Sequence, residues 1–82
     1  MAAGILTTAN SCDINRDLFF GTRGDDVKCL QEYLGVINTG FFGNLTKGAV
    51  ANWQTDNGVA PAAGYFGPIS WKKYQQLASA AP

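Results

Sequence analysis

The sequence contains no histidine. That absence excludes Ser–His–Asp and Cys–His nucleophilic mechanisms and histidine-ligated zinc. Glycoside hydrolysis would instead need two carboxylates that face each other. The available acids are Asp13, Asp17, Asp25, Asp26, Glu32 and Asp56. Asp25 and Asp26 are neighbours on one predicted helix and point in different directions, and Glu32 and Asp56 are expected to face solvent. We therefore predict a protein with no enzymatic activity, no metal site and no cofactor.

The chain also lacks net charge and long apolar runs. Its six acidic and six basic residues cancel. Affinity for nucleic acid rests largely on Lys and Arg that neutralise phosphates, so no nucleic-acid partner is expected. No apolar run approaches the roughly 20 residues of a transmembrane helix, so no membrane insertion is expected either. The 82 residues are enough for one small domain whose core is marginal without reinforcement.

Cysteine is scarce, and the two that occur are Cys12 and Cys29. Two thiols without histidine do not complete a zinc site, and their spacing is not that of a CxxC redox pair. A disulfide between them would close a loop of about 18 residues and stabilise the fold by roughly 3 kcal/mol. The alternative is two reduced thiols, one of them buried. We predict the disulfide.

A disulfide also implies an oxidising compartment, and so an exported protein. The first residues, MAAGILTTANS, lack the basic region and the longer apolar stretch of a signal peptide. A targeting segment would therefore already have been removed.

Three amphipathic stretches, each bounded by turn or stop signals, predict helices near residues 25–34, 44–57 and 68–78. In the first, Val27, Leu30 and Leu34 form one apolar stripe, and Gly35 suits the left-handed stop position. We expect the second helix to be buried through Leu45, Ala49, Val50 and Trp53, and the third through Ile69, Tyr74 and Leu77. Gly48, inside the second helix, is expected to allow another segment to approach closely.

One short pattern occurs twice, as GFFGNLT from Gly40 and as GYFGPIS from Gly64, each time at the start of a predicted helix. Phe42 and Phe66 are expected to fold under the helix starts, much as in a hydrophobic staple. Gly43 and Gly67 are expected to adopt backbone angles that a side chain would forbid. Gln31 and Gln54 are expected to hydrogen-bond the backbone of the turns. The repeat therefore predicts two structural turns that start helices.

Taken together, the spacing of these residues resembles the peptidoglycan-binding-like domain. The resemblance runs from Leu18 to Leu77 and rests on Leu18, Gly21, Gly24, Val27, Leu30, Gln31, Leu34, Gly40, Phe42, Gly43, Thr46, Ala49, Val50, Trp53, Gln54, Gly58, Gly64, Phe66, Gly67, Ser70, Trp71 and Leu77. It implies an all-α fold, a compact three-helix bundle that is usually non-catalytic and often appended to bacterial cell-wall hydrolases. Trp53 stands where the family usually has Phe, and the two cysteines lie outside the general pattern.

The expected organisation has three parts. An irregular N-terminal segment covers residues 1–17 and is tethered by the disulfide. The peptidoglycan-binding-like domain covers residues 18–78, and a frayed tail covers residues 79–82.

A glycan site needs exposed aromatic rings beside hydrogen-bonding groups, because sugars present apolar C–H faces and a rim of hydroxyls. The aromatic residues least clearly assigned to the core are Tyr33, Phe41, Tyr65 and Trp71. From these and from nearby polar residues we predict glycan contacts by Trp71, Tyr65, Tyr33, Gln75 and Arg23.

The resemblance thus implies a non-catalytic module that binds peptidoglycan or a related cell-wall polysaccharide. The alternative is a protein-interaction or scaffold module that keeps the fold without binding glycan. One concave groove containing Tyr33, Tyr65 and Trp71 would favour the first, and a flat or convex apolar patch would favour the second.

Overall fold

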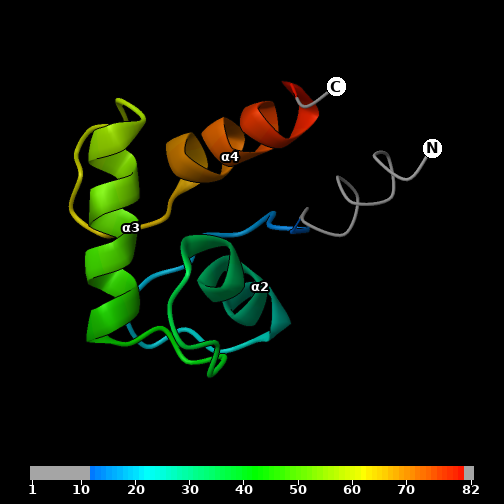
Figure 1. Cartoon of the computed structure of the whole chain (residues 1–82), viewed down its shortest axis with the longest axis vertical. Coiled ribbons are helices and arrows are strands. Elements are labelled where there is room, and N and C mark those ends of the chain that lie inside the picture. Colours follow the sequence, from blue (N-terminus) through cyan, green and yellow to red (C-terminus); the bar gives the residue numbers. More distant parts are fainter. Residues whose placement is uncertain (1–11, 81–82) are drawn as a thin grey trace.

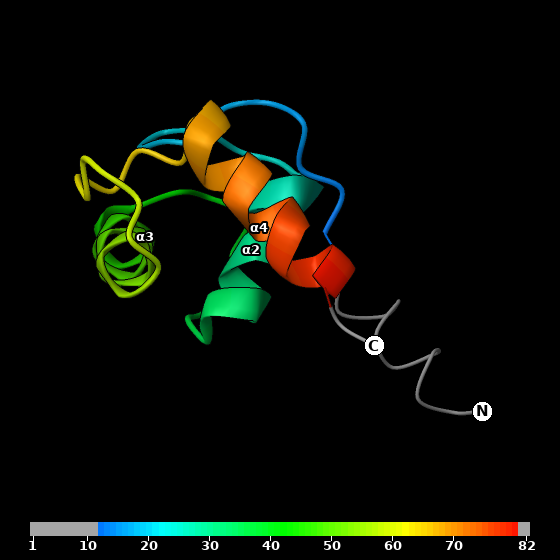
Figure 2. The ribbon, with the colours of Figure 1, turned by 90° about the horizontal axis from the view of Figure 1, so that it is seen from above.

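The computed structural model describes residues 12–80. These residues form three helices joined by irregular segments: α2 (Asp25–Leu34), α3 (Asn44–Asp56) and α4 (Pro68–Ala80). α4 crosses above α2, and α3 stands beside this pair (Figures 1 and 2). The predicted all-α three-helix bundle is confirmed, and no strand occurs in the described part of the chain. α4 ends at Ala80 rather than near residue 78. The rest of the predicted N-terminal segment and tail, residues 1–11 and 81–82, lies outside the described residues.

The irregular segment of residues 12–18, which we call the strap, passes between α2 and α4 (Figure 1). The predicted disulfide is confirmed and joins Cys12 at the start of the strap to Cys29 on α2. At the other end, Leu18 and Phe66 exchange two backbone hydrogen bonds of 2.9 and 2.8 Å. The Arg16 guanidinium donates to Asp26 on α2 at 2.6 Å and holds the pKa of that carboxyl below its usual value.

The repeated turns are built by glutamine clamps, one in each copy. Gln54 Nε2 donates to the carbonyl of Tyr65 at 2.7 Å and to Ser70 Oγ at 2.9 Å. Gln54 Oε1 accepts the N–H of Gly64 at 2.9 Å. In the first copy Gln31 makes the same three bonds, to the carbonyl of Phe41, to Thr46 Oγ1 and from the N–H of Gly40. Both glutamines are almost fully buried, so each clamp ties a helix to the turn that follows it.

The glycines of the repeat do not act as predicted. Gly40 and Gly64, the first glycine of each copy, have φ of 82° and 85°, which is the left-handed region. Gly43 has φ of −103°, and Gly67 is not among the glycines with positive φ, so the prediction of forbidden angles at these two positions was wrong. At Gly67 the constraint is steric, since a Cβ there would lie 2.8 Å from the Tyr65 ring. A Cβ on Gly43 would lie 3.4 Å from the Phe41 ring, which is an ordinary contact.

The core lies where the strap and the inner faces of the helices meet, and Phe42 and Phe66 are fully buried in it as predicted. Three predicted core residues are exposed instead: Leu45 (73%), Ile69 (63%) and Leu77 (38%). The reason for the first two is that Thr46 and Ser70 turn inward to meet the glutamine clamps. The preceding residue, about 100° away around the helix, must then point outward.

Gly48 was also predicted wrongly. A Cβ at this position would meet nothing within 4 Å, so no segment approaches α3 there. Gly64, by contrast, has the backbone of α3 as a close neighbour, since its Cβ would lie 2.7 Å from the carbonyl oxygen of Lys47.

Candidate functional site

The predicted glycan residues do not form one site. Trp71, Tyr65 and Gln75 lie where the strap meets the start and middle of α4. Tyr33 lies on a cleft between α2 and α3, and Arg23 lies beside Phe41. Tyr33 and Tyr65 line different cavities, so the single groove of Tyr33, Tyr65 and Trp71 that would favour a glycan site does not form.

Trp71 and Tyr65 meet at Asp17, and we call Asp17, Phe19, Tyr65 and Trp71 the Asp17 cluster. The Tyr65 hydroxyl donates to Asp17 Oδ2 at 2.6 Å, and Trp71 Nε1 donates to Oδ1 at 3.3 Å. The bond to Asp17 raises the pKa of Tyr65. Phe19 stacks on Tyr65 with ring centroids 5.4 Å apart, and Gly67 lies against the same ring. The rings are therefore engaged within the protein, although Tyr65 is 48% exposed.

Gln75 and Arg23 are also engaged. Gln75 Nε2 donates to the carbonyl of Ile14 at 3.1 Å, so this side chain fastens the strap to α4. The Arg23 guanidinium lies 4.6 Å from the centroid of the Phe41 ring, a cation–π geometry at the surface. Phe20 meets the same ring edge-on.

The cleft between α2 and α3 has a different character. Its volume is about 420 Å³, and its lining residues are Tyr33, Leu34, Ala49, Asn52, Trp53 and Asp56. We call it the α2–α3 cleft. Ligand pockets typically measure roughly 300–1,000 Å³, so this cleft reaches that range. The cavities beside the two repeated turns measure about 240 and 220 Å³ and fall below it.

The two helices supply different chemistry to this cleft. From α2 comes Tyr33, which is 41% exposed. From α3 comes Trp53, which is only 9% exposed and donates from Nε1 to the Tyr33 hydroxyl at 3.1 Å. The two rings meet edge-to-face with centroids 6.5 Å apart. This hydrogen bond holds the Tyr33 ring against Trp53 at the border between core and solvent.

Asn52 and Asp56 flank Trp53 on α3 and are exposed. They are four positions apart, so they lie one turn apart on the same face of the helix. Within residues 12–80 neither side chain makes a hydrogen bond or an ion pair. The α2–α3 cleft therefore combines an aromatic surface with an amide and a carboxylate that remain available to a ligand.

Asn52, Trp53 and Asp56 were not predicted as site residues. Trp53 belonged to the predicted core stripe, and Asp56 was assigned to a solvent face. The signal in the sequence was the spacing of an amide and an acid around a tryptophan.

Other site types find no support in the described residues. No group of three Cys, Asp or Glu side chains among residues 12–80 is placed to hold a metal ion. Within the same residues, no helix has the length and apolar character needed to cross a membrane.

Comparison of the chain with protein families, with curated proteins and with solved structures finds no match.

Proposed function

We propose that this protein is a non-catalytic module that binds peptidoglycan or a related cell-wall polysaccharide through the α2–α3 cleft. The observation that carries the proposal is the cleft itself, in which Tyr33 and Trp53 stand beside the unengaged side chains of Asn52 and Asp56. Sugars are bound by just this combination of aromatic surface and hydrogen-bonding groups. The resemblance in the spacing of the turn and helix residues supports the same class of ligand.

The binding geometry follows from the chemistry of the lining residues. The exposed part of the Tyr33 ring would contact the C–H face of a sugar. Asp56 would accept hydrogen bonds from sugar hydroxyls, and the Asn52 amide would donate to or accept from a hydroxyl or an N-acetyl group. A disulfide is typical of proteins that function in oxidising compartments, which agrees with an exported protein.

Retention on insoluble peptidoglycan, with cellulose and chitin as comparison polymers, tests this function. Asn52→Ala and Asp56→Asn should each weaken retention severalfold without changing the melting temperature, since neither native side chain has a partner within the described chain. Tyr33→Ala should weaken affinity about tenfold or more, which is the loss of roughly 1.4 kcal/mol or more expected for an aromatic contact.

Tyr65→Ala is the matched comparison, because it removes a similarly exposed tyrosine from the Asp17 cluster. We expect it to leave more binding than Tyr33→Ala does. The reverse ranking would place the glycan on the Asp17 cluster. Retention on none of the three polymers would overturn the proposal.

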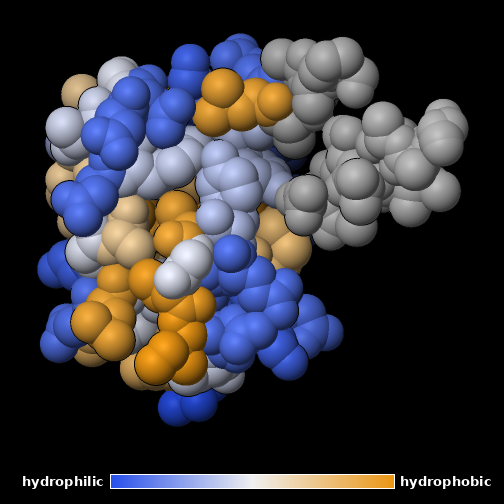
Figure 3. Space-filling model, in the orientation of Figure 1, coloured by the Kyte–Doolittle hydropathy of each residue, from blue (hydrophilic) through white to orange (hydrophobic). Residues whose placement is uncertain are grey.

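The second candidate is a protein-interaction module, and one observation favours it. Ile37 and Leu45 are strongly exposed beside the first repeated turn, and Ile69 is strongly exposed beside the second. Figure 3 shows apolar side chains gathered at the start of α3 and in the loop before it. If no polysaccharide retains the protein, this apolar surface becomes the better starting point.

A further inference from the structure

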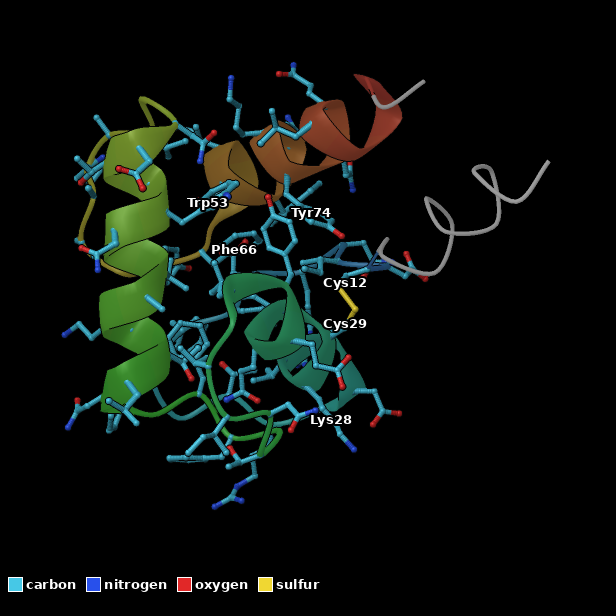
Figure 4. All side chains as sticks on the ribbon, viewed as in Figure 1. Cys12, Lys28, Cys29, Trp53, Phe66 and Tyr74 are labelled. Carbon is cyan, nitrogen blue, oxygen red and sulfur yellow. A yellow bond between two sulfur atoms is a disulfide. The ribbon has the colours of Figure 1, made fainter. Side chains whose placement is uncertain are left out.

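An unbroken row of contacts joins the disulfide to the α2–α3 cleft. The backbone N–H of Cys12 donates to the Tyr74 hydroxyl at 2.6 Å. The Tyr74 ring meets the Tyr33 ring edge-to-face, with centroids 4.9 Å apart. Tyr33 in turn accepts the hydrogen bond from Trp53 Nε1. Figure 4 shows Tyr74 pointing from α4 toward α2, between Trp53 and the disulfide.

Tyr74 is well suited to transmit a change along this row. It is only 2% exposed, and burial raises the pKa of its hydroxyl, which therefore stays neutral. Its bond to Cys12 is buried and spans 62 positions of sequence. A packed ring of this kind has few alternative positions, because protein interiors are close to crystal density.

The disulfide also acts on Tyr33 from the other side. Cys29 and Tyr33 are four positions apart on α2, so they lie one turn apart on the same face. Cys12 is thus fixed both to the helix that carries Tyr33 and, through its backbone, to the ring that packs against Tyr33.

We propose that Tyr74 is a positioning residue that makes ligand binding in the α2–α3 cleft depend on the Cys12–Cys29 disulfide. The proposal rests on the function proposed above. With the disulfide intact, Cys12 holds the Tyr74 hydroxyl, Tyr74 holds the Tyr33 ring, and Tyr33 stays bonded to Trp53 at the cleft. With the disulfide reduced, the start of the strap is released, and the Tyr33 ring loses its fixed support.

The chemical step is thiol–disulfide exchange with a dithiol reductant. One thiolate of the reductant attacks a protein sulfur, the S–S bond breaks, and a mixed disulfide forms. The second thiol of the reductant then displaces the other protein sulfur. The reductant leaves as its own disulfide, two electrons and two protons pass to the protein, and Cys12 and Cys29 become thiols.

The experiment measures affinity for soluble disaccharide–peptide fragments of peptidoglycan by calorimetry, on oxidised and reduced protein, with and without Tyr74→Phe. We expect reduction to weaken affinity about threefold to tenfold, the range for one lost hydrogen bond. Tyr74→Phe keeps the ring but removes the bond to Cys12, so in oxidised protein it should weaken affinity to a similar degree. Reduction of Tyr74→Phe should then add little, because both changes break the same link.

The control is Arg16→Gln, which loosens the same strap at its ion pair with Asp26 without touching Tyr74. It should leave affinity and its dependence on the disulfide unchanged. If reduction and Tyr74→Phe each weaken affinity and their fold-losses multiply in the combination, the two changes act independently and the proposal is overturned. Equal affinity of the oxidised and reduced wild-type protein would also overturn it.

A second readout needs no ligand. The indole N–H signals of Trp53 and Trp71 can be assigned in a nitrogen–proton correlation spectrum with a Trp71→Phe variant. Tyr74→Phe in the oxidised protein should shift the Trp53 signal more than the Trp71 signal, and this holds even if the reduced form unfolds. If the fragments do not bind the oxidised wild type, the function proposed above fails, and the Trp53 signal alone decides whether the coupling exists. An unmoved Trp53 signal would refute it.

Discussion

Replacing Gln54 by leucine should remove much of the stability of this domain. The substitution puts an apolar side chain of similar size in place of the amide and deletes the three hydrogen bonds of the second glutamine clamp. At about 1 kcal/mol net for each bond, the loss is about 3 kcal/mol. Ser70 and the N–H of Gly64 are buried, so leaving them without Gln54 adds to the cost. The total stability expected for a chain of this length is about 4–12 kcal/mol.

Urea unfolding followed by circular dichroism measures this loss as a shift of the midpoint at constant slope. Gln31→Leu is a replicate within the same chain, because it deletes the equivalent bonds of the first clamp. Gln76→Leu is the control, since Gln76 is exposed on α4 and should change stability by less than about 0.5 kcal/mol. A cost below about 1 kcal/mol for Gln54→Leu would show that the clamps do not hold the turns.

Three further predictions concern stability. Phe66→Ala should cost about 3–5 kcal/mol in urea unfolding, because the ring is fully buried, and a loss under about 1 kcal/mol would contradict its place in the core. Gly48→Ala should raise the unfolding free energy by about 0.5–1 kcal/mol, and Gly64→Ala should lower it, because of the two only Gly64 has a positive φ and a close backbone neighbour. Equal changes in unfolding free energy for the two variants would contradict this expectation. Arg16→Gln should be less stable than wild type at neutral pH. Because the folded pKa of Asp26 lies below its usual 3.8, this difference should vanish as the pH falls through that lowered value, and a pH-independent difference would count against the ion pair.

The helices were predictable because their signals are local. Val27, Leu30 and Leu34 repeat at helical spacing, and Gly35 ends α2 with φ of 80°, bonding back to the carbonyls of Gln31 and Glu32. The disulfide was predictable because the composition left few other roles for the two cysteines in so small a domain.

The faces of the helices were less predictable, because they depend on partners far away in sequence. Apolar spacing alone placed Leu45 and Ile69 inside the protein. In the structure the adjacent hydroxyls, Thr46 and Ser70, occupy the inner face because buried glutamine amides require hydrogen-bond partners. The sequence does show a glutamine before each turn and a hydroxyl residue after it. That the two side chains hydrogen-bond each other becomes clear only once the chain is folded.

The candidate site was harder still, because it forms between two helices. Tyr33 was selected for its uncertain burial, which is a property of one residue. The cleft that gives Tyr33 its proposed role depends on Trp53, Asn52 and Asp56 from α3, and their proximity follows from how α2 packs against α3. Likewise, Asp17 gave no sign in the sequence that it would accept hydrogen bonds from both Tyr65 and Trp71.

The internal repeat itself separates structural from functional positions. Gln31 aligns with Gln54, and the turns align after one extra residue in the second copy; the aligned residues are alike where they build the turns. The clamps are both Gln, the hydroxyls are Thr46 and Ser70, and the buried rings are Phe42 and Phe66.

Along the helices before the turns, the alignment of Gln31 with Gln54 pairs several unlike residues, among them Cys29 with Asn52, Leu30 with Trp53, and Tyr33 with Asp56. Five of these six residues form the disulfide or line the α2–α3 cleft, and the sixth, Leu30, is core. Turn geometry requires the same residues in both copies, whereas a ligand site between α2 and α3 requires each helix to supply a different group. Several of the differences between the copies therefore fall on the disulfide and the cleft, the two features that Tyr74 connects.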